Sequence, residues 1–315
     1  MTTEDISDHR HRYDELDVSE WVLAAEEPLG TKPKQWLIHP DTGHRWLMKD
    51  ATFNTPSGGP KYRKGDDWAE RVAYGVAEAL CLPAARVELS VAFRGEGRAY
   101  GTICRSVLKD RGEHLVHGNA LLAEALHAEG IHVTGDDRES YTVTAIHRVL
   151  GDCQPPTDAS DDLSAWDVFV GYLALDALIG NTDRHNRNWA VIESGSGRCL
   201  APSFDHASSL GFLLSDAERQ ERLSSKDHNR TPEAYADRAR TRFAGKPHPI
   251  AALDNARALD GETAVTHWLN QPKGIEDLVA PIWAIPEDRM SEPAREFAER
   301  IMRRNWARLT GPDRR

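Results

Sequence analysis

Short runs of apolar and β-favouring residues mark the first third of the chain as rich in strands. Two such runs, at residues 35–39 and 45–49, flank a Pro-Asp-Thr-Gly segment whose residue types favour a turn. This arrangement predicts a hairpin. Two longer runs of the same kind, at residues 85–93 and 97–108, complete a sheet-rich region.

A pattern with the helical period separates these two pairs of strands. It predicts a helix from near residue 66 to Leu82, with Asp66 or Asp67 as its cap and Pro83 as its stop. One broad face of this helix is apolar. Glu70 falls at the edge of that face, and an acidic side chain in such a place needs a partner.

From about residue 114 the pattern changes to helical segments. The clearest one covers residues 163–179, follows Asp161 or Asp162 as a cap, and is ended by Gly180. Because this segment is apolar on most sides, it is expected to lie inside a domain.

This order of segments predicts an α+β fold with two lobes, a small β-rich N-lobe and a larger, mainly helical C-lobe. The length of 315 residues, 40% of them hydrophobic, is enough for two lobes around a cleft. We place a flexible lead-in at residues 1–13, the N-lobe at residues 14–110 and the C-lobe at residues 111–315.

Composition and charge limit the compartments and the classes of partner that fit this chain. No run approaches the length of a membrane helix, and the N-terminus lacks the apolar core of a secretory signal. The net charge of −11 gives no general attraction to nucleic acid or anionic lipid. The four cysteines form no CxxC pair and suit reduced thiols. We therefore expect a cytoplasmic protein that binds neither membranes nor nucleic acid directly.

A polar cluster at residues 181–188 lies between the predicted buried helix and an apolar strand. It contains Asp183 and Asn188, and the end of the next strand delivers Asp205. Phosphoryl transfer uses such a set, because one carboxylate takes the proton of the acceptor hydroxyl while an Asp and an Asn hold Mg²⁺. The interval of five residues from Asp183 to Asn188 equals that of the H-R-D-L-x-x-x-N loop of protein kinases. Taken alone, so short a match is also compatible with a hydrogen-bonded turn.

The N-terminal third supplies the rest of a nucleotide site. Lys49 ends an apolar strand, in the manner of the lysine that contacts the α- and β-phosphates in kinases, and Glu70 on the next helix is its natural partner. Gly30, Thr31 and Lys32 precede the hairpin, where a loop that covers phosphates belongs. A solitary Lys or Glu is typically a solvated charge. All of these features occur in kinase order, however, which makes coincidence the minor explanation.

The chain resembles the HipA-like kinases, a bacterial branch of the kinase superfamily. Residues 180–185 with Asn188 resemble the G-N-x-D-x-H-x-x-N catalytic segment of that family, and residues 202–205 resemble its metal-binding turn. Residues 70–83 are similar to the helix that carries its Lys-pairing Glu. The likeness covers about residues 28–215.

The resemblance implies a protein-kinase-like fold, ATP and Mg²⁺ as cofactors, and a Ser/Thr hydroxyl of a protein or peptide as acceptor. The residue roles that it implies are Asp183 as catalytic base, His185 as a brace of the catalytic loop, Asn188 and Asp205 as Mg²⁺ ligands, Lys49 with Glu70 as the ATP-positioning pair, and Gly30, Thr31 and Lys32 in the phosphate loop. Residues 181–188 are also similar to the catalytic segment of phosphatidylinositol 3-/4-kinases, in particular the type II 4-kinases, so this motif leaves the acceptor class open.

Two departures from the family matter. HipA toxins carry an additional N-terminal subdomain, whereas little more than 25 residues precede the phosphate loop here, and this makes an antitoxin partner doubtful. HipA also inactivates itself by phosphorylation of a serine in its phosphate loop. Residues 29–34 contain no serine, only Thr31, which argues against that route.

Three alternatives stay open. A small-molecule kinase would act on a polyol, an antibiotic or a lipid headgroup. A metal-dependent phosphohydrolase would use Asp183, His185, Asp205 and His206 as ligands, but it leaves Lys49 and Glu70 unexplained. A non-catalytic kinase-like binding module would not need every catalytic position to be filled.

Residues 208–245 lie where a kinase has its activation or substrate-binding segment. This stretch mixes acidic residues with basic ones, namely Arg219, Arg222, Lys226, Arg230, Arg238, Arg240 and Arg242. Its simplest interpretation is a solvated helical surface. A local basic strip there would suit an acidic acceptor or a phosphate.

Overall fold

The computed structural model describes residues 12–26, 34–54, 62–94, 97–109, 112–128, 130 and 139–311. The expected phosphate loop, with Gly30, Thr31 and Lys32, lies outside the described residues. So do residues 1–11 of the expected lead-in. Tyr13, at the end of that segment, packs against the body of the protein, because its backbone N–H donates to the carbonyl of Ala284 at 2.8 Å.

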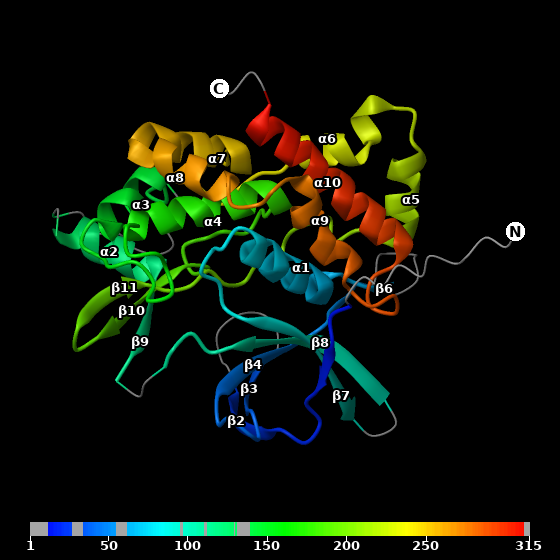
Figure 1. Cartoon of the computed structure of the whole chain (residues 1–315), viewed down its shortest axis with the longest axis horizontal. Helices are drawn as coiled ribbons and strands as arrows, with labels where there is room; N and C mark the ends of the chain where they lie inside the picture. The colour runs from blue at the N-terminus through cyan, green and yellow to red at the C-terminus, as the bar shows by residue number, and fades with distance from the viewer. Residues whose placement is uncertain are drawn as a thin grey trace, which may run out of the picture.

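A six-stranded sheet forms the N-terminal region, at the bottom of Figure 1. Its order is β1 (Glu15–Asp17), β7 (Val87–Arg94), β8 (Gly97–Arg105), β4 (Arg45–Asp50), β3 (Lys34–Ile38) and β2 (Val22–Glu26). The β1–β7 pair is parallel and the other neighbours are antiparallel. Both predicted strand pairs are confirmed, as β3–β4 and β7–β8.

Helix α1 (Asp66–Ala79) lies between this sheet and the helical part of the molecule (Figure 1). The predicted helix is confirmed, but its predicted cap is wrong. Gly65 occupies the N-cap position, and neither Asp66 nor Asp67 caps the helix. Both carboxylates have tertiary partners instead, because Asp66 accepts hydrogen bonds from Thr52 and Asp67 accepts them from Arg289.

Helix α4 (Ala165–Ile179) forms the centre of the protein, and every one of its residues except Asp167 is buried. The prediction of an inner helix is confirmed, whereas Asp161 and Asp162 are wrong as caps. Ser164 is the N-cap, and its hydroxyl and the Asp167 carboxylate form a reciprocal capping box. Gly180 ends the helix with a φ of 65°, a left-handed conformation that favours glycine.

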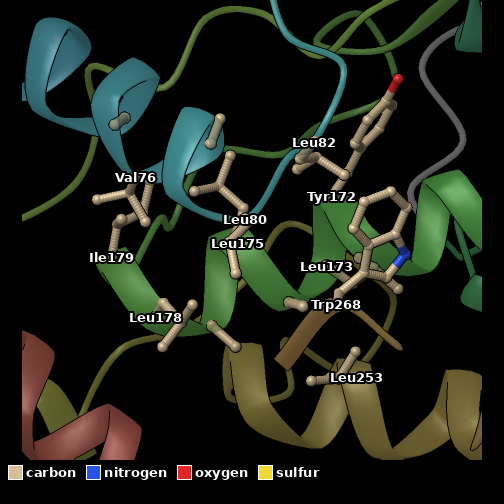
Figure 2. Close-up of a cluster of buried hydrophobic side chains, with 14 of the residues drawn as sticks. Val76, Leu80, Leu82, Tyr172, Leu173, Leu175, Leu178, Ile179, Leu253 and Trp268 are labelled. Carbon is tan, nitrogen blue, oxygen red and sulfur yellow. The ribbon is translucent and has the colours of Figure 1, made fainter. Parts of the chain in front are cut away.

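Apolar side chains join α4 to the helices on either side of it. Figure 2 shows Leu175 of α4 facing Leu80 of α1, with Leu253 of α7 (Pro249–Ala256) on the opposite side of α4. Trp268 of α8 (Glu262–Leu269) lies beside α4, with its ring toward Leu82. One buried cluster contains Leu80, Leu175, Leu253 and Trp268, which are at most 1% exposed. Burial of a side chain of this size contributes about 1.5–3 kcal/mol, so this cluster helps to hold α4 and thereby the start of the loop that follows it.

The remaining elements surround this centre (Figure 1). A second sheet has the order β11 (Gly197–Leu200), β10 (Ala190–Ser194) and β9 (His114–His117), and β5 (Phe53–Asn54) pairs with β6 (Tyr62–Arg63). The other helices are α2 (Gly118–Ala128), α3 (Val143–Leu150), α5 (Asp216–Ser224), α6 (Pro232–Asp237), α9 (Ile275–Trp283) and α10 (Glu292–Thr310), with short helical turns at His228–Arg230 and Arg257–Gly261. Within the described residues, no helix is both long and apolar enough to cross a membrane.

The predicted α+β class, with a β-rich N-terminal region and a mainly helical C-terminal part, is confirmed. The lobe boundary near residue 110 stays a prediction.

Candidate functional site

Residues 181–188 form a loop between α4 and β10, and hydrogen bonds fix its backbone. The Asn181 side chain accepts from the N–H of Asp183 at 3.0 Å and donates to Asp176 of α4 at 2.8 Å. From the other end of the loop, the Asn188 amide donates to the carbonyl of Asp183 at 2.8 Å. The backbone of Asp183 is therefore held on both sides, which limits the positions that its carboxylate can reach.

A buried arginine joins this loop to the core. The Arg184 guanidinium donates to both carboxylate oxygens of Asp176, at 2.7 and 2.8 Å. It also donates to the carbonyl of Asn188 at 2.8 Å and to the hydroxyl of Ser203 at 3.1 Å. Burial opposes the charge on Arg184, yet the nearby Asp176 raises the pKa of this guanidinium, so the arginine is charged.

Sequence reasoning missed this arginine and its partner. The available signal was Asp176 itself, since a carboxylate beyond the first turn of a mostly apolar, buried helix needs a cation. The bracing role was assigned to His185 instead. His185 makes contacts within the loop. Its backbone N–H donates to the Asp183 carbonyl at 2.7 Å, and its ring Nδ1 accepts from the backbone N–H of Arg187 at 3.1 Å. Burial lowers the pKa of His185, so the ring is neutral at neutral pH, and its role in function stays a prediction.

Asp205 lies in a turn after β11 and adopts a φ of 63°, a left-handed conformation that is unfavourable for a non-glycine residue. Glu70 of α1 holds the next two residues in place. Its carboxylate accepts from the N–H of His206 at 2.8 Å and from the N–H of Ala207 at 3.0 Å. The side chain of His206 is buried, and its Nε2 lies 2.7 Å from the hydroxyl of Ser203. These contacts maintain a strained backbone at Asp205.

Lys49 extends from β4 to this turn. Its ammonium lies 2.7 Å from Asp205 Oδ1 and 3.9 Å from Glu70 Oε2. The structure therefore brings Lys49 and Glu70 together as predicted, but the shorter contact is with Asp205. Burial opposes the charge on Lys49, and the two carboxylates outweigh it and raise its pKa. The Lys49 ammonium in turn lowers the pKa of Asp205, so both groups are charged at neutral pH.

The Asp183 carboxylate has a partner that sequence reasoning did not assign to the site. The Arg242 Nε donates to Asp183 Oδ1 at 2.8 Å. Arg242 had been noted only as one member of a basic stretch, and nothing in the local sequence distinguishes it from its neighbours.

The donor set of this site fits Mg²⁺. Asp205 supplies a carboxylate. The Asn188 side chain donates through its nitrogen to the Asp183 carbonyl, and its amide oxygen can therefore face a metal ion. Arg184 ties the two positions together, because it bonds to the Asn188 carbonyl and to Ser203 just before the Asp205 turn. Mg²⁺ prefers oxygen ligands and needs only one or two from the protein.

The chain was compared with known proteins. The model of the HipA-like C-terminal domain matches residues 25–268. The structure is similar to the crystal structure of the proinflammatory kinase CtkA of Helicobacter pylori, with a TM-score of 0.68 and 17% identity over 93% of this chain and 94% of that one.

The structure is also similar to HipA of Shewanella oneidensis MR-1, solved in a complex with HipB and its operator DNA. The TM-score is 0.53 and the identity 14%, over 98% of this chain and 67% of that one. A search of functionally curated protein sequences finds no match. The likeness to these two structures confirms the predicted kinase-like fold.

Proposed function

The chain belongs to the family of HipA-like C-terminal domains, and we propose that it is a kinase that transfers the γ-phosphate of ATP, with Mg²⁺, to a Ser or Thr hydroxyl of a protein or peptide. One observation carries this proposal. Lys49 from the sheet, Glu70 from α1 and Asp205 from the turn after β11 meet within hydrogen-bond or ion-pair distance. A nucleotide site of the kinase type uses a Lys–Glu ion pair beside a metal-binding Asp.

The proposed reaction assigns one task to each residue. Asp183 takes the proton of the acceptor hydroxyl while the hydroxyl oxygen bonds to the γ-phosphorus. The bond between the γ-phosphorus and the bridging oxygen of the β-phosphate breaks, and ADP leaves. Lys49 binds the α- and β-phosphates, and Glu70 positions Lys49. Asn188 and Asp205 would hold Mg²⁺, which when bound neutralises charge on the phosphates.

The remaining assignments are also proposals. Gly30, Thr31 and Lys32 would cover the phosphates, and His185 would support the loop. All four cysteines are free, which supports a reducing compartment such as the cytoplasm. HipB and operator DNA are partners of the Shewanella protein, and for this chain we propose the protein or peptide acceptor alone.

The structure weighs against the phosphohydrolase alternative. Among the described residues, no three or more His, Cys, Asp or Glu side chains converge to hold a metal ion. His206, one of the four ligands of that hypothesis, is buried with its Nε2 beside Ser203, where it is engaged structurally. A small-molecule kinase remains the second candidate for the acceptor, because the same phosphate machinery would serve it.

Labelled ATP tests the proposal. We expect the protein with Mg²⁺ to transfer γ-labelled phosphate to at least one protein of a bacterial lysate. The Asp183→Ala variant should bind ATP as before and lose transfer by about 10²-fold or more, since general-base catalysis is worth that much. Equal labelling by this variant would remove Asp183 as the base. Label confined to small molecules would favour the second candidate, and hydrolysis of a phosphoester without nucleotide would favour the phosphohydrolase.

A further inference from the structure

Arg242 reaches the proposed catalytic base from a distant part of the chain. Its Nε donates to Asp183 Oδ1 at 2.8 Å, although the two residues are 59 positions apart. The Arg242 side chain is 56% exposed and that of Asp183 is 29% exposed. No described residue accepts a hydrogen bond from the Nη atoms of Arg242, so its hydrogen bonding to the described protein is to this one carboxylate oxygen.

The backbone around this arginine is anchored to the catalytic loop. Thr241 and Phe243, its two neighbours, are both buried. The ring of Phe243 stacks on Tyr141 with 4.8 Å between the ring centroids. The hydroxyl of Tyr141 donates to the carbonyl of Arg184 at 3.0 Å, next to the proposed base. An exposed side chain with such fixed neighbours is held near its target by the fold itself.

The simplest alternative is a surface ion pair with no function, which contributes about 0–1 kcal/mol. Two other arginines of residues 208–245 make local surface contacts, and one of these contacts is such an ion pair. Arg230 pairs with Glu221 on the surface, and Arg240 donates to the backbone carbonyls of Asp237 and Ala239. Among the described arginines of this stretch, Arg242 is the one whose partner lies in the catalytic loop.

We propose that Arg242 is a positioning residue for Asp183, an inference that rests on the proposed kinase function. Its Nε holds Oδ1 and thereby fixes the rotation of the carboxylate, so that Oδ2 is the oxygen that accepts the proton of the acceptor hydroxyl. Arg242 itself forms and breaks no covalent bond. Misplacement of a reacting group by about 1 Å costs on the order of 10²-fold in rate, so a loss of this hold is measurable.

Steady-state kinetics with labelled ATP and casein as the acceptor tests this role. The Arg242→Ala variant should lower kcat about 10- to 100-fold while KM for ATP stays within about twofold, because Asp183 and not the nucleotide loses its support. Guanidinium ion added far below unfolding concentrations should restore part of the lost kcat, since the position is open to solvent. The matched control is Arg240→Ala, which removes an exposed arginine two residues away and should leave kcat unchanged.

A double variant shows whether Arg242 acts through Asp183. In an Asp183→Ala background, Arg242→Ala should cause no further loss, because the group that it positions is already gone. Further loss in that background, or an Arg242→Ala variant as active as or more active than the wild type, overturns the inference and leaves the kinase proposal intact. A wild-type protein that transfers no phosphate overturns both.

Discussion

Lys49 lies between two carboxylates and contacts them unequally. Its ammonium is closer to Asp205, at 2.7 Å, than to Glu70, at 3.9 Å. The pKa of Asp205 is lowered by Lys49, which means that the folded state binds a proton at Asp205 less readily than the unfolded chain does. Stability from this contact is therefore present above the ordinary carboxyl pKa and is lost as the pH falls through the lowered value.

Separate substitutions of Lys49 and Asp205 distinguish a residue that binds phosphate from one that binds the metal ion. Lys49→Met should weaken ATP binding about tenfold or more, since a charged hydrogen bond is worth about 1.5–3 kcal/mol, and additional Mg²⁺ should not restore it. Asp205→Asn should raise the Mg²⁺ concentration needed for binding, and high Mg²⁺ should recover part of the affinity. Calorimetric titration of ATP at low and high Mg²⁺ measures both. Unchanged ATP affinity in Lys49→Met would contradict the nucleotide site.

At the scale of elements, α1 connects the sheet to the turn that carries Asp205. Glu70 makes this connection because its carboxylate accepts hydrogen bonds from the backbone N–H groups of His206 and Ala207, at 2.8 and 3.0 Å. Burial acts to raise the pKa of Glu70, but Lys49 and the hydrogen bond with His206 outweigh it, and the net shift of the pKa is downward. The carboxylate is thus charged and can accept both hydrogen bonds at neutral pH.

A Glu70→Gln variant tests whether α1 holds the turn. The glutamine side chain offers one acceptor where the carboxylate offers two, so one N–H of the turn loses its partner, at a cost of about 1–3 kcal/mol. We expect faster amide hydrogen exchange at His206 and Ala207 and a lower Tm. Glu78→Gln, on an exposed position of the same helix, is the control and should change neither. Unchanged exchange at both amides in Glu70→Gln would show that the turn holds itself.

The elements also show how far the sequence could predict the molecule. The strand of Lys49 and the helix of Glu70 follow from local apolar periodicity, which the structure preserves. Caps at Asp66 and Asp67 were wrong because distant residues take both carboxylates, and sequence spacing does not reveal such partners. The cap of α4 was available locally, since Ser164 precedes an acid by three residues. Asp176 signalled the need for a buried cation, but which arginine would supply it, and which carboxylate Arg242 would reach, depend on the fold of the loop.

At the scale of the whole molecule, one buried arginine joins the N-terminal sheet, α1 and the segment between α9 and α10. The side chain of Arg289 is 0% exposed and pairs with Asp67 of α1 at 2.9 Å and with Glu15 of β1. It also donates to the carbonyls of Gly101 in β8, at 2.7 Å, and of Ser90 in β7, at 3.2 Å. This single side chain therefore helps to fix the sheet that carries Lys49 relative to the helices.

Replacement of Arg289 should destabilise the protein strongly and in a pH-dependent way. Arg289→Met leaves the Asp67 carboxylate, 1% exposed, without its closest cation, and loss of one partner of a buried pair costs about 3–5 kcal/mol. Burial already raises the pKa of Asp67, so the folded state binds a proton there more readily than the unfolded chain does. The destabilisation should therefore shrink as the pH falls towards the ordinary carboxyl pKa, because Asp67 then takes up a proton.

Denaturant unfolding at several pH values, with Asp67→Asn added as a second substitution, measures this effect. The double variant should be more stable than Arg289→Met alone at neutral pH and should lose most of the pH dependence, because the neutral amide has no charge to bury. Arg300→Met is a matched control, since Arg300 pairs with Glu233 at a partly exposed position and its loss should cost about 1 kcal/mol or less. Equal destabilisation by Arg289→Met and Arg300→Met would mean that the sheet and the helices are fixed by apolar packing rather than by Arg289.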